Sequence, residues 1–172
     1  EKILQDICWE EYEDILFVSK SIGTVISSAF ARRHQLSAKN ILFTPLQQTF
    51  LFADGNGIVF HGTADPWADT KDITEGCKKL NLPLILTDEG NHSLETGDTL
   101  KDLENLQQII GLLFNSLDKL QTKPLPPIRH ICDFSRGVLN VRLCARIQHL
   151  LRDHKYALLG AMASVLWLEK MN

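Results

Sequence analysis

The stretch DILFVSKSIGT, residues 14–24, decides the fold of this chain. Four apolar residues at 15–18 are too few for a helix and suit a strand that is buried on both faces. The segment SKSIG, residues 19–23, follows, and a helical pattern begins there at once. This order predicts a strand, a sharp turn that carries Ser21, and a helix whose first backbone N–H groups point toward the serine.

The same alternation of short strands and helices continues to about residue 120. Further strands are predicted at residues 40–43, 49–52, 58–60 and 82–86, and helices at 69–80 and 100–120. The helix after Ser21 has apolar residues at 22, 25, 26, 29 and 30, a spacing that predicts packing on a sheet. The alternation predicts an α/β fold with a mainly parallel sheet and helices on both faces.

The charge of the chain changes sign near Pro124. Residues 1–122 hold 10 basic and 18 acidic side chains, whereas residues 123–172 hold 8 and 3. The linker QTKPLPP, residues 121–127, cannot continue a helix. A helical pattern resumes over residues 138–171 and is apolar nearly all round at 158–168. We therefore divide the chain into an α/β domain, 1–122, and a C-terminal appendage, 123–172, made of a Pro-rich linker and a basic, apolar helical segment.

Composition and length favour a globular protein of the cytoplasm. The chain has 172 residues, of which 44% are hydrophobic, and no apolar run reaches the roughly 18 residues that a membrane span requires. Its start has neither a signal-peptide pattern nor an initiator Met, so we expect a fragment of a longer protein. Its four cysteines lack CxxC spacing, which favours buried free thiols over a zinc site or disulfides. We expect no metal and no cofactor.

Three residues carry the chemistry that the sequence predicts. Ser21, Asp65 and His92 each follow the end of a different predicted strand. The carboxyl ends of parallel strands meet along one edge of a sheet, so the three side chains can meet there. A serine hydroxyl needs an imidazole to take its proton and a third group to fix the imidazole's tautomer. The chain order Ser, Asp, His is that of the α/β-hydrolase fold.

The chain resembles the C-terminal half of the α/β-hydrolase superfamily over residues 14 to about 120, and is most similar to its small bacterial serine hydrolases. The motifs are VSKSIGT at 18–24 as the nucleophile elbow, HGTADPW at 61–67 as the acid loop and GNHSL at 90–94 as the histidine loop. The resemblance implies a catalytic triad of Ser21 as nucleophile, His92 as general base and Asp65 as its orienter. It also implies that the backbone N–H of Ile22 forms half of the oxyanion hole.

The chain departs from the family in two ways. Ser19 stands where the family usually has a glycine, two residues before the nucleophile. Serine is small enough to allow the strand and the helix to approach each other closely. The family's first strands, and the loop that donates the second oxyanion N–H, would precede residue 1. An unpaired strand flank invites pairing with another chain. We therefore expect a homo-oligomer or a partner chain that completes the sheet.

Less specific interpretations of the same residues stay open. Ser21 can be a helix N-cap, Asp65 a turn former before proline, and His92 an exposed loop residue. Asp69 and Asp88 are rival partners for the histidine.

The residues around the triad have alternatives too. Lys20 and Trp67 are candidate substrate-pocket residues, although Lys20 can be a solvated charge and Trp67 can simply cover the domain. His61 is expected to be a satisfied core or edge residue. The basic C-terminal segment can touch nucleic acid or anionic lipid, but no motif supports this, and a docking helix is favoured.

The sequence thus predicts a serine hydrolase of the carboxylic ester hydrolase type. It would cleave a small-molecule ester, thioester or amide through an acyl-enzyme on Ser21, with no nucleic-acid partner and no membrane span. The alternative is a non-catalytic, truncated or fused hydrolase remnant that acts as an assembly or interaction domain. A nucleotide-binding domain of the Rossmann type is weaker, because no Gly-rich phosphate loop follows any strand.

Overall fold

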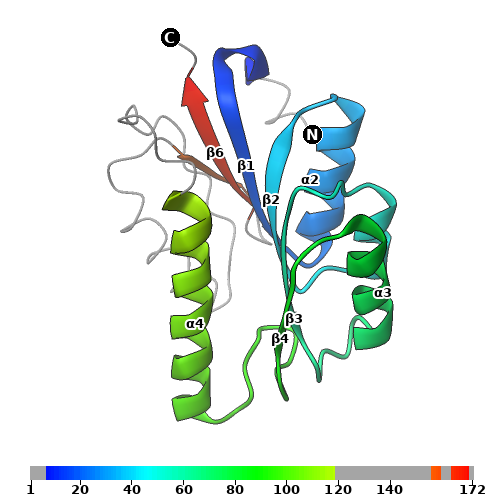
Figure 1. The fold of residues 1–172 in the computed structure, drawn as a ribbon, viewed down its shortest axis with the longest axis vertical. Helices are drawn as coiled ribbons and strands as arrows, with labels where there is room; N and C mark the ends of the chain where they lie inside the picture. The colour runs from blue at the N-terminus through cyan, green and yellow to red at the C-terminus, as the bar shows by residue number, and fades with distance from the viewer. Residues whose placement is uncertain (1–6, 119–155, 160–163, 171–172) are drawn as a thin grey trace.

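The computed structural model describes residues 7–118, 156–159 and 164–170 (Figure 1). Its strands form one sheet in the order β4-β3-β2-β1-β6-β5. The first four along the chain are parallel to one another, and they are β1 (Tyr12–Lys20), β2 (Ala38–Phe43), β3 (Gly57–Gly62) and β4 (Leu84–Thr87). Each is joined to the next by a crossover connection, as parallel pairing requires. The predicted α/β class is confirmed.

Strand β1 lies inside the sheet and is buried on both faces. Its residues from Ile15 to Ser19 are all buried, although alternate side chains of a strand point to opposite faces. β2 pairs with one flank, from Ile15 against Ala38 to Lys20 against Phe43. The strand predicted from the opening stretch is therefore present, and it extends further toward the N-terminus than the apolar run indicated.

Three α-helices in the described part of the chain cover the sheet. α2 (Ile22–Arg33) and α3 (Thr70–Leu80) lie on one side of it, and α4 (Thr99–Asp118) lies on the other (Figure 1). α3 begins where the sequence predicted, because the side chain of Asp69 accepts a hydrogen bond from the backbone N–H of Lys71 at 2.7 Å. The prediction of helices on both faces is confirmed.

The face of α2 that packs on the sheet is only partly the one that the apolar spacing predicted, because Phe30 is the one fully buried residue of the predicted set. Its buried residues are small or polar except at one end, and they are Gly23, Thr24, Ser27, Ser28, Phe30 and Ala31. Ile22 and Ile26 are instead 42% and 50% exposed. Small side chains let the helix approach the sheet closely. Hydroxyl pairs such as Ser27 to Ser19, 3.0 Å apart, satisfy some of the polar groups buried there, although the hydroxyl of Ser28 has no partner.

The strand predicted at residues 49–52 is absent. Those residues fall within and just after a 3₁₀ helix, η2 (Gln47–Leu51). Phe50 packs so tightly against α3 that a Cβ on Gly76 would lie 2.4 Å from its ring. Thr49 is buried and its hydroxyl contacts that of Thr24 at 2.7 Å. The apolar character of this segment thus reflects packing between helices rather than a place in the sheet. A second 3₁₀ helix, η1 (Trp9–Glu11), precedes β1.

Two C-terminal segments are strands where a helix was predicted. β5 (Tyr156–Leu159) and β6 (Ser164–Lys170) form an antiparallel pair, and β6 pairs antiparallel with β1 from Ile15 against Leu168 to Val18 against Val165. The helix prediction is therefore wrong at these residues. A short apolar run is compatible with a buried strand as well as with a helix. Here the run forms β6, which pairs with the flank of β1 that β2 leaves open. The rest of the predicted appendage lies outside the described residues, and the division at residue 122 stays a prediction.

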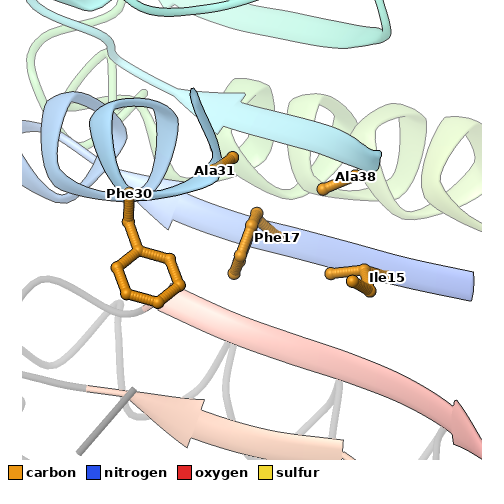
Figure 2. Close-up of a cluster of buried hydrophobic side chains, with 5 residues drawn as sticks. All are labelled: Ile15, Phe17, Phe30, Ala31 and Ala38. Carbon is orange, nitrogen blue, oxygen red and sulfur yellow. The ribbon is translucent and has the colours of Figure 1, made fainter. Parts of the chain in front are cut away.

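A hydrophobic cluster joins β1 and β2 to α2. Figure 2 shows its buried members, which are Ile15, Phe17, Phe30, Ala31 and Ala38. The ring of Trp9 packs on two of them, with centroids 6.0 Å from Phe17 and 5.5 Å from Phe30. This cluster, together with Trp9 from the segment before β1, holds α2 against the sheet and so stabilises the turn between β1 and α2.

The cysteines agree only partly with the expectation of buried thiols. Cys77 is free and buried in α3, and burial raises the pKa of its thiol to about 11. Cys8 is free but exposed. The other two lie outside the described residues. None of the helices in the described part of the chain is long and apolar enough to cross a membrane.

Candidate active site

The carboxyl ends of the four parallel strands bring the predicted residues to one edge of the sheet. Ser21 follows β1 directly, and its N–H donates to the carbonyl of Phe43, the last residue of β2, at 3.0 Å. The N–H of Thr44, just past β2, donates to Phe60 in β3 at 2.7 Å. Asp65 and His92 lie in the loops that follow β3 and β4.

Ser21 occupies the sharp turn that the sequence predicted. Its φ of 54° and ψ of −129° lie outside the regions that residues other than glycine ordinarily adopt. It stands at the N-cap position of α2 but makes no capping hydrogen bond with its side chain. Helix capping therefore does not explain the serine at this position. Its hydroxyl is not used by the helix.

The turn at Ser21 is held by Thr24. Both the N–H and the hydroxyl of Thr24 donate to the carbonyl of Ser21, at 3.0 and 2.6 Å. The first N–H groups of an α-helix have no partner within the helix and carry partial positive charge. The N–H of Ile22, the first residue of α2, is therefore placed beside the serine, as an oxyanion donor would be.

Asp65 and His92 meet through a short hydrogen bond. Nδ1 of His92 lies 2.8 Å from Oδ2 of Asp65, whose side chain is fully buried. The other carboxylate oxygen, Oδ1, accepts from the N–H of Trp67 at 2.9 Å. Since a carboxylate only accepts, Nδ1 carries the proton and Nε2 of the neutral ring is the basic nitrogen. The ring of His92 is about one fifth exposed.

The two rival carboxylates have other partners. Asp69 caps α3. Asp88 accepts a hydrogen bond from the hydroxyl of Thr63 at 3.2 Å. Asp65 is therefore the carboxylate that orients His92, as the sequence predicted.

The loop that carries His92 depends on residues that the sequence prediction did not single out. A Cβ on Gly62 would lie 2.2 Å from the carbonyl oxygen of Gly90, so only glycine allows this loop to approach the end of β3. Asn91 braces the loop, because its Oδ1 accepts from the N–H groups of Ser93 at 2.7 Å and Glu95 at 3.2 Å. In the sequence, the glycine directly after His61 was the feature that could have indicated a close approach of another segment at the end of this strand.

A second histidine lies beside the same carboxylate. His61 is fully buried at the end of β3, and its Nδ1 is 3.8 Å from Oδ2 of Asp65. Its Nε2 lies 3.1 Å from the hydroxyl of Thr70. Burial lowers the pKa of His61, and the charge of Asp65 offsets this only partly. The ring is in the core as expected, but its Nδ1 has no hydrogen-bond partner.

The predicted pocket residues, Lys20 and Trp67, differ in exposure. Lys20, the last residue of β1, is partly buried; burial lowers its pKa, against the opposing effects of Asp65 and Glu95. It is therefore not a freely solvated charge, and it already faces two carboxylates. Trp67 is 73% exposed, with its ring centroid 6.0 Å from that of His92. It therefore does little to cover the domain and presents an apolar surface beside the histidine.

Backbone strain gathers at this edge. Four of the six non-glycine residues with positive φ in the described part of the chain lie just past a parallel strand or in the histidine loop. These four are Ser21, Thr44, Glu89 and Leu94. Thr44 is β-branched and fully buried, with a hydroxyl that has no partner. Such strain persists only where the surrounding structure imposes it, and it is concentrated at functional sites.

The structure therefore shows direct contact between two of the three predicted triad residues. Asp65 and His92 are hydrogen-bonded, and Ser21 stands on the same edge, although no hydrogen bond joins Ser21 to His92. Such contacts are often long in an unliganded enzyme. A cavity of about 410 Å³ lies toward the opposite edge, among residues such as Ser28, Arg32 and Asn40, and is not part of this site.

Comparisons with protein-family models, curated proteins and solved structures find no match for this chain. The resemblance to α/β-hydrolases therefore stays a prediction, and the argument for function depends on the site itself.

Proposed function

We propose that this protein is a serine hydrolase that cleaves a small ester, thioester or amide through an acyl-enzyme on Ser21. The observation that carries the proposal is the 2.8 Å hydrogen bond between His92 and the buried Asp65, at the sheet edge that also holds Ser21. An imidazole oriented in this way, at the same sheet edge as a serine with positive φ and no capping hydrogen bond, has the components that nucleophilic catalysis requires.

The roles follow from the donors and acceptors present. Nε2 of His92 takes the proton of the Ser21 hydroxyl as Oγ attacks the substrate carbonyl. The protonated imidazole then gives that proton to the leaving group, and Asp65 stabilises the positive charge in between. The N–H of Ile22 donates to the oxyanion. Water, activated by the same histidine, releases the acid and restores Ser21.

Two apolar side chains indicate the kind of substrate. Trp67 is 73% exposed beside His92, and Ile22 is 42% exposed next to Ser21. They offer an apolar surface to the acyl or leaving group of a substrate held between them. Lys20 is a weaker substrate contact than the sequence indicated, because Asp65 and Glu95 already oppose its charge.

The test is covalent labelling with a fluorophosphonate probe, followed by mass spectrometry to locate the adduct. The wild-type chain should be labelled on Ser21, and Ser21→Ala and His92→Ala should both abolish labelling. Ser93→Ala is the matched control, because it removes a hydroxyl from the same sheet edge and should leave labelling intact. A folded wild-type protein that takes no label would overturn the proposal in favour of a non-catalytic assembly domain. A label that survives Ser21→Ala would overturn the assignment of Ser21 as the nucleophile.

A further inference from the structure

We infer that His61 is a positioning residue for the candidate triad, with its Nδ1–H directed at the carboxylate of Asp65. This inference extends the proposed function, because it assigns a second histidine to the same site. It begins with an unpartnered atom: Nδ1 of His61 is buried and makes no hydrogen bond, yet it lies 3.8 Å from Oδ2 of Asp65. Buried polar atoms without a partner are rare and call for an explanation.

The proton of Thr70 decides the tautomer of His61. That hydroxyl has two candidate acceptors, Nε2 of His61 at 3.1 Å and the carbonyl of Thr63 at 3.5 Å. The second distance is at the outer limit of a hydrogen bond, so the distances favour donation to Nε2. A neutral imidazole then carries its own proton on Nδ1.

The opposite tautomer is disfavoured by the charge it would face. It would place the lone pair of Nδ1 beside the Asp65 carboxylate in a site without water contact, since both side chains are fully buried. With the proton on Nδ1, the same distance gives an attractive charge–dipole interaction. The other titratable groups that act on His61 are His92 and Asp69, and Lys20 in β1 interacts with Asp65.

The consequence is a third N–H group that faces a buried carboxylate, at a distance longer than a hydrogen bond. Oδ1 of Asp65 is held by the N–H of Trp67, while Oδ2 faces both His92 and, at longer range, His61. A buried polar group needs partners within the protein to offset its lost hydration. The His61 dipole therefore helps to fix the orientation of the Asp65 carboxylate, on which His92 depends.

The tautomer can be read without any activity. A long-range ¹H–¹⁵N spectrum of the wild-type protein, with His61 assigned by comparison with His61→Asn, should show a protonated Nδ1 and an unprotonated Nε2 in the neutral ring. The reverse pattern would overturn the inference. This result does not depend on whether Ser21 reacts, so it separates a failure of this inference from a failure of the proposed function.

Two substitutions then test the role. The amide of His61→Asn can replace the Nδ1–H, whereas that of His61→Gln replaces Nε2 and leaves Asp65 without this donor. We expect fluorophosphonate labelling of Ser21 to be slowed about tenfold by His61→Gln, and the downfield Nδ1 proton of His92 to shift or broaden. His61→Asn should restore both readouts to near the wild-type values.

His34→Asn is the control, because His34 is exposed and outside this site. Equal losses in His61→Asn and His61→Gln, with both proteins folded by circular dichroism, would show that His61 only fills space and would overturn the positioning role.

Discussion

Gly62 and Gly90 are packed so closely that a Cβ on Gly62 would lie 2.2 Å from the carbonyl oxygen of Gly90. These residues end β3 and open the loop of His92, and they are 28 positions apart in the chain. The contact brings the histidine loop to the carboxylate of Asp65. The geometry of the candidate site therefore depends on the absence of a side chain at Gly62.

Gly62→Ala should therefore damage the site more than its size suggests. The new methyl group meets backbone on the neighbouring loop, which must move and carry His92 away from Asp65. We expect labelling of Ser21 to fall by about 100-fold, the scale for a misplacement of about 1 Å. Gly111→Ala is the control, because a Cβ there has nothing within 4 Å and alanine favours the helix. Wild-type labelling in Gly62→Ala would contradict the prediction.

Ser21→Gly should stabilise the fold while it removes the nucleophile. Relief of the backbone strain at φ 54° is worth about 1–3 kcal/mol, and the added flexibility of glycine costs about 0.5–1 kcal/mol. A net gain of about 1 kcal/mol would raise the unfolding temperature by about 2–4 °C. The same change at Ser93, whose φ is not positive, should give no gain. A stability loss in Ser21→Gly would mean that the turn is not strained.

Acid should destabilise the wild-type protein partly through His61. The pKa of this residue is lowered in the folded state, mainly by burial, so the unfolded chain takes up a proton first as the pH falls. The contribution to stability is complete above the unfolded value of about 6.5 and is lost as the pH falls from there toward the folded value. In urea titrations at pH 7.5 and 5.5, the free energy of unfolding should fall less between the two pH values in His61→Asn than in the wild type. Equal losses would contradict the burial of a neutral ring.

The two described cysteines should react at very different rates. Burial in α3 raises the pKa of Cys77 to about 11, so its thiolate is scarce at pH 8, whereas Cys8 is exposed. With iodoacetamide and site-resolved mass spectrometry, Cys8 should be modified first. Cys77 should react only after denaturant is added. Rapid modification of Cys77 in the folded protein would indicate that α3 opens easily.

The order of strands and helices around the site could be predicted because each depends on local pattern. The apolar run before Ser21, the capping Asp69 and the turn after β3 each specify an element within a few residues. The sequence also places Asp65 and His92 on successive strand ends, and parallel pairing alone then brings them to one edge. Their hydrogen bond follows from that topology.

The failed predictions concern segments whose neighbours decide their structure. The apolar residues at 49–52 and 164–170 are each compatible with more than one kind of element. The first segment forms a 3₁₀ helix that packs on α2 and α3. The second forms the strand β6, which pairs with β1. The face of α2 was misplaced for a similar reason. Close packing against β1 selects Gly23 and Ser27 over Ile26, and this preference for small residues has no signature in hydrophobic spacing.

By itself, then, the sequence determined the α/β class, the turn at Ser21 and the identity of the carboxylate–histidine pair, since these depend on short-range pattern and on the order of strands. Only the tertiary structure decided which face of α2 is buried, that β6 covers the flank of β1, and that His61 stands 3.8 Å from Asp65. The first two features arise from contacts between segments distant in the chain, where space and partners rather than local propensity select the conformation. The third depends on the turn that follows β3, because His61 and Asp65 are only four residues apart.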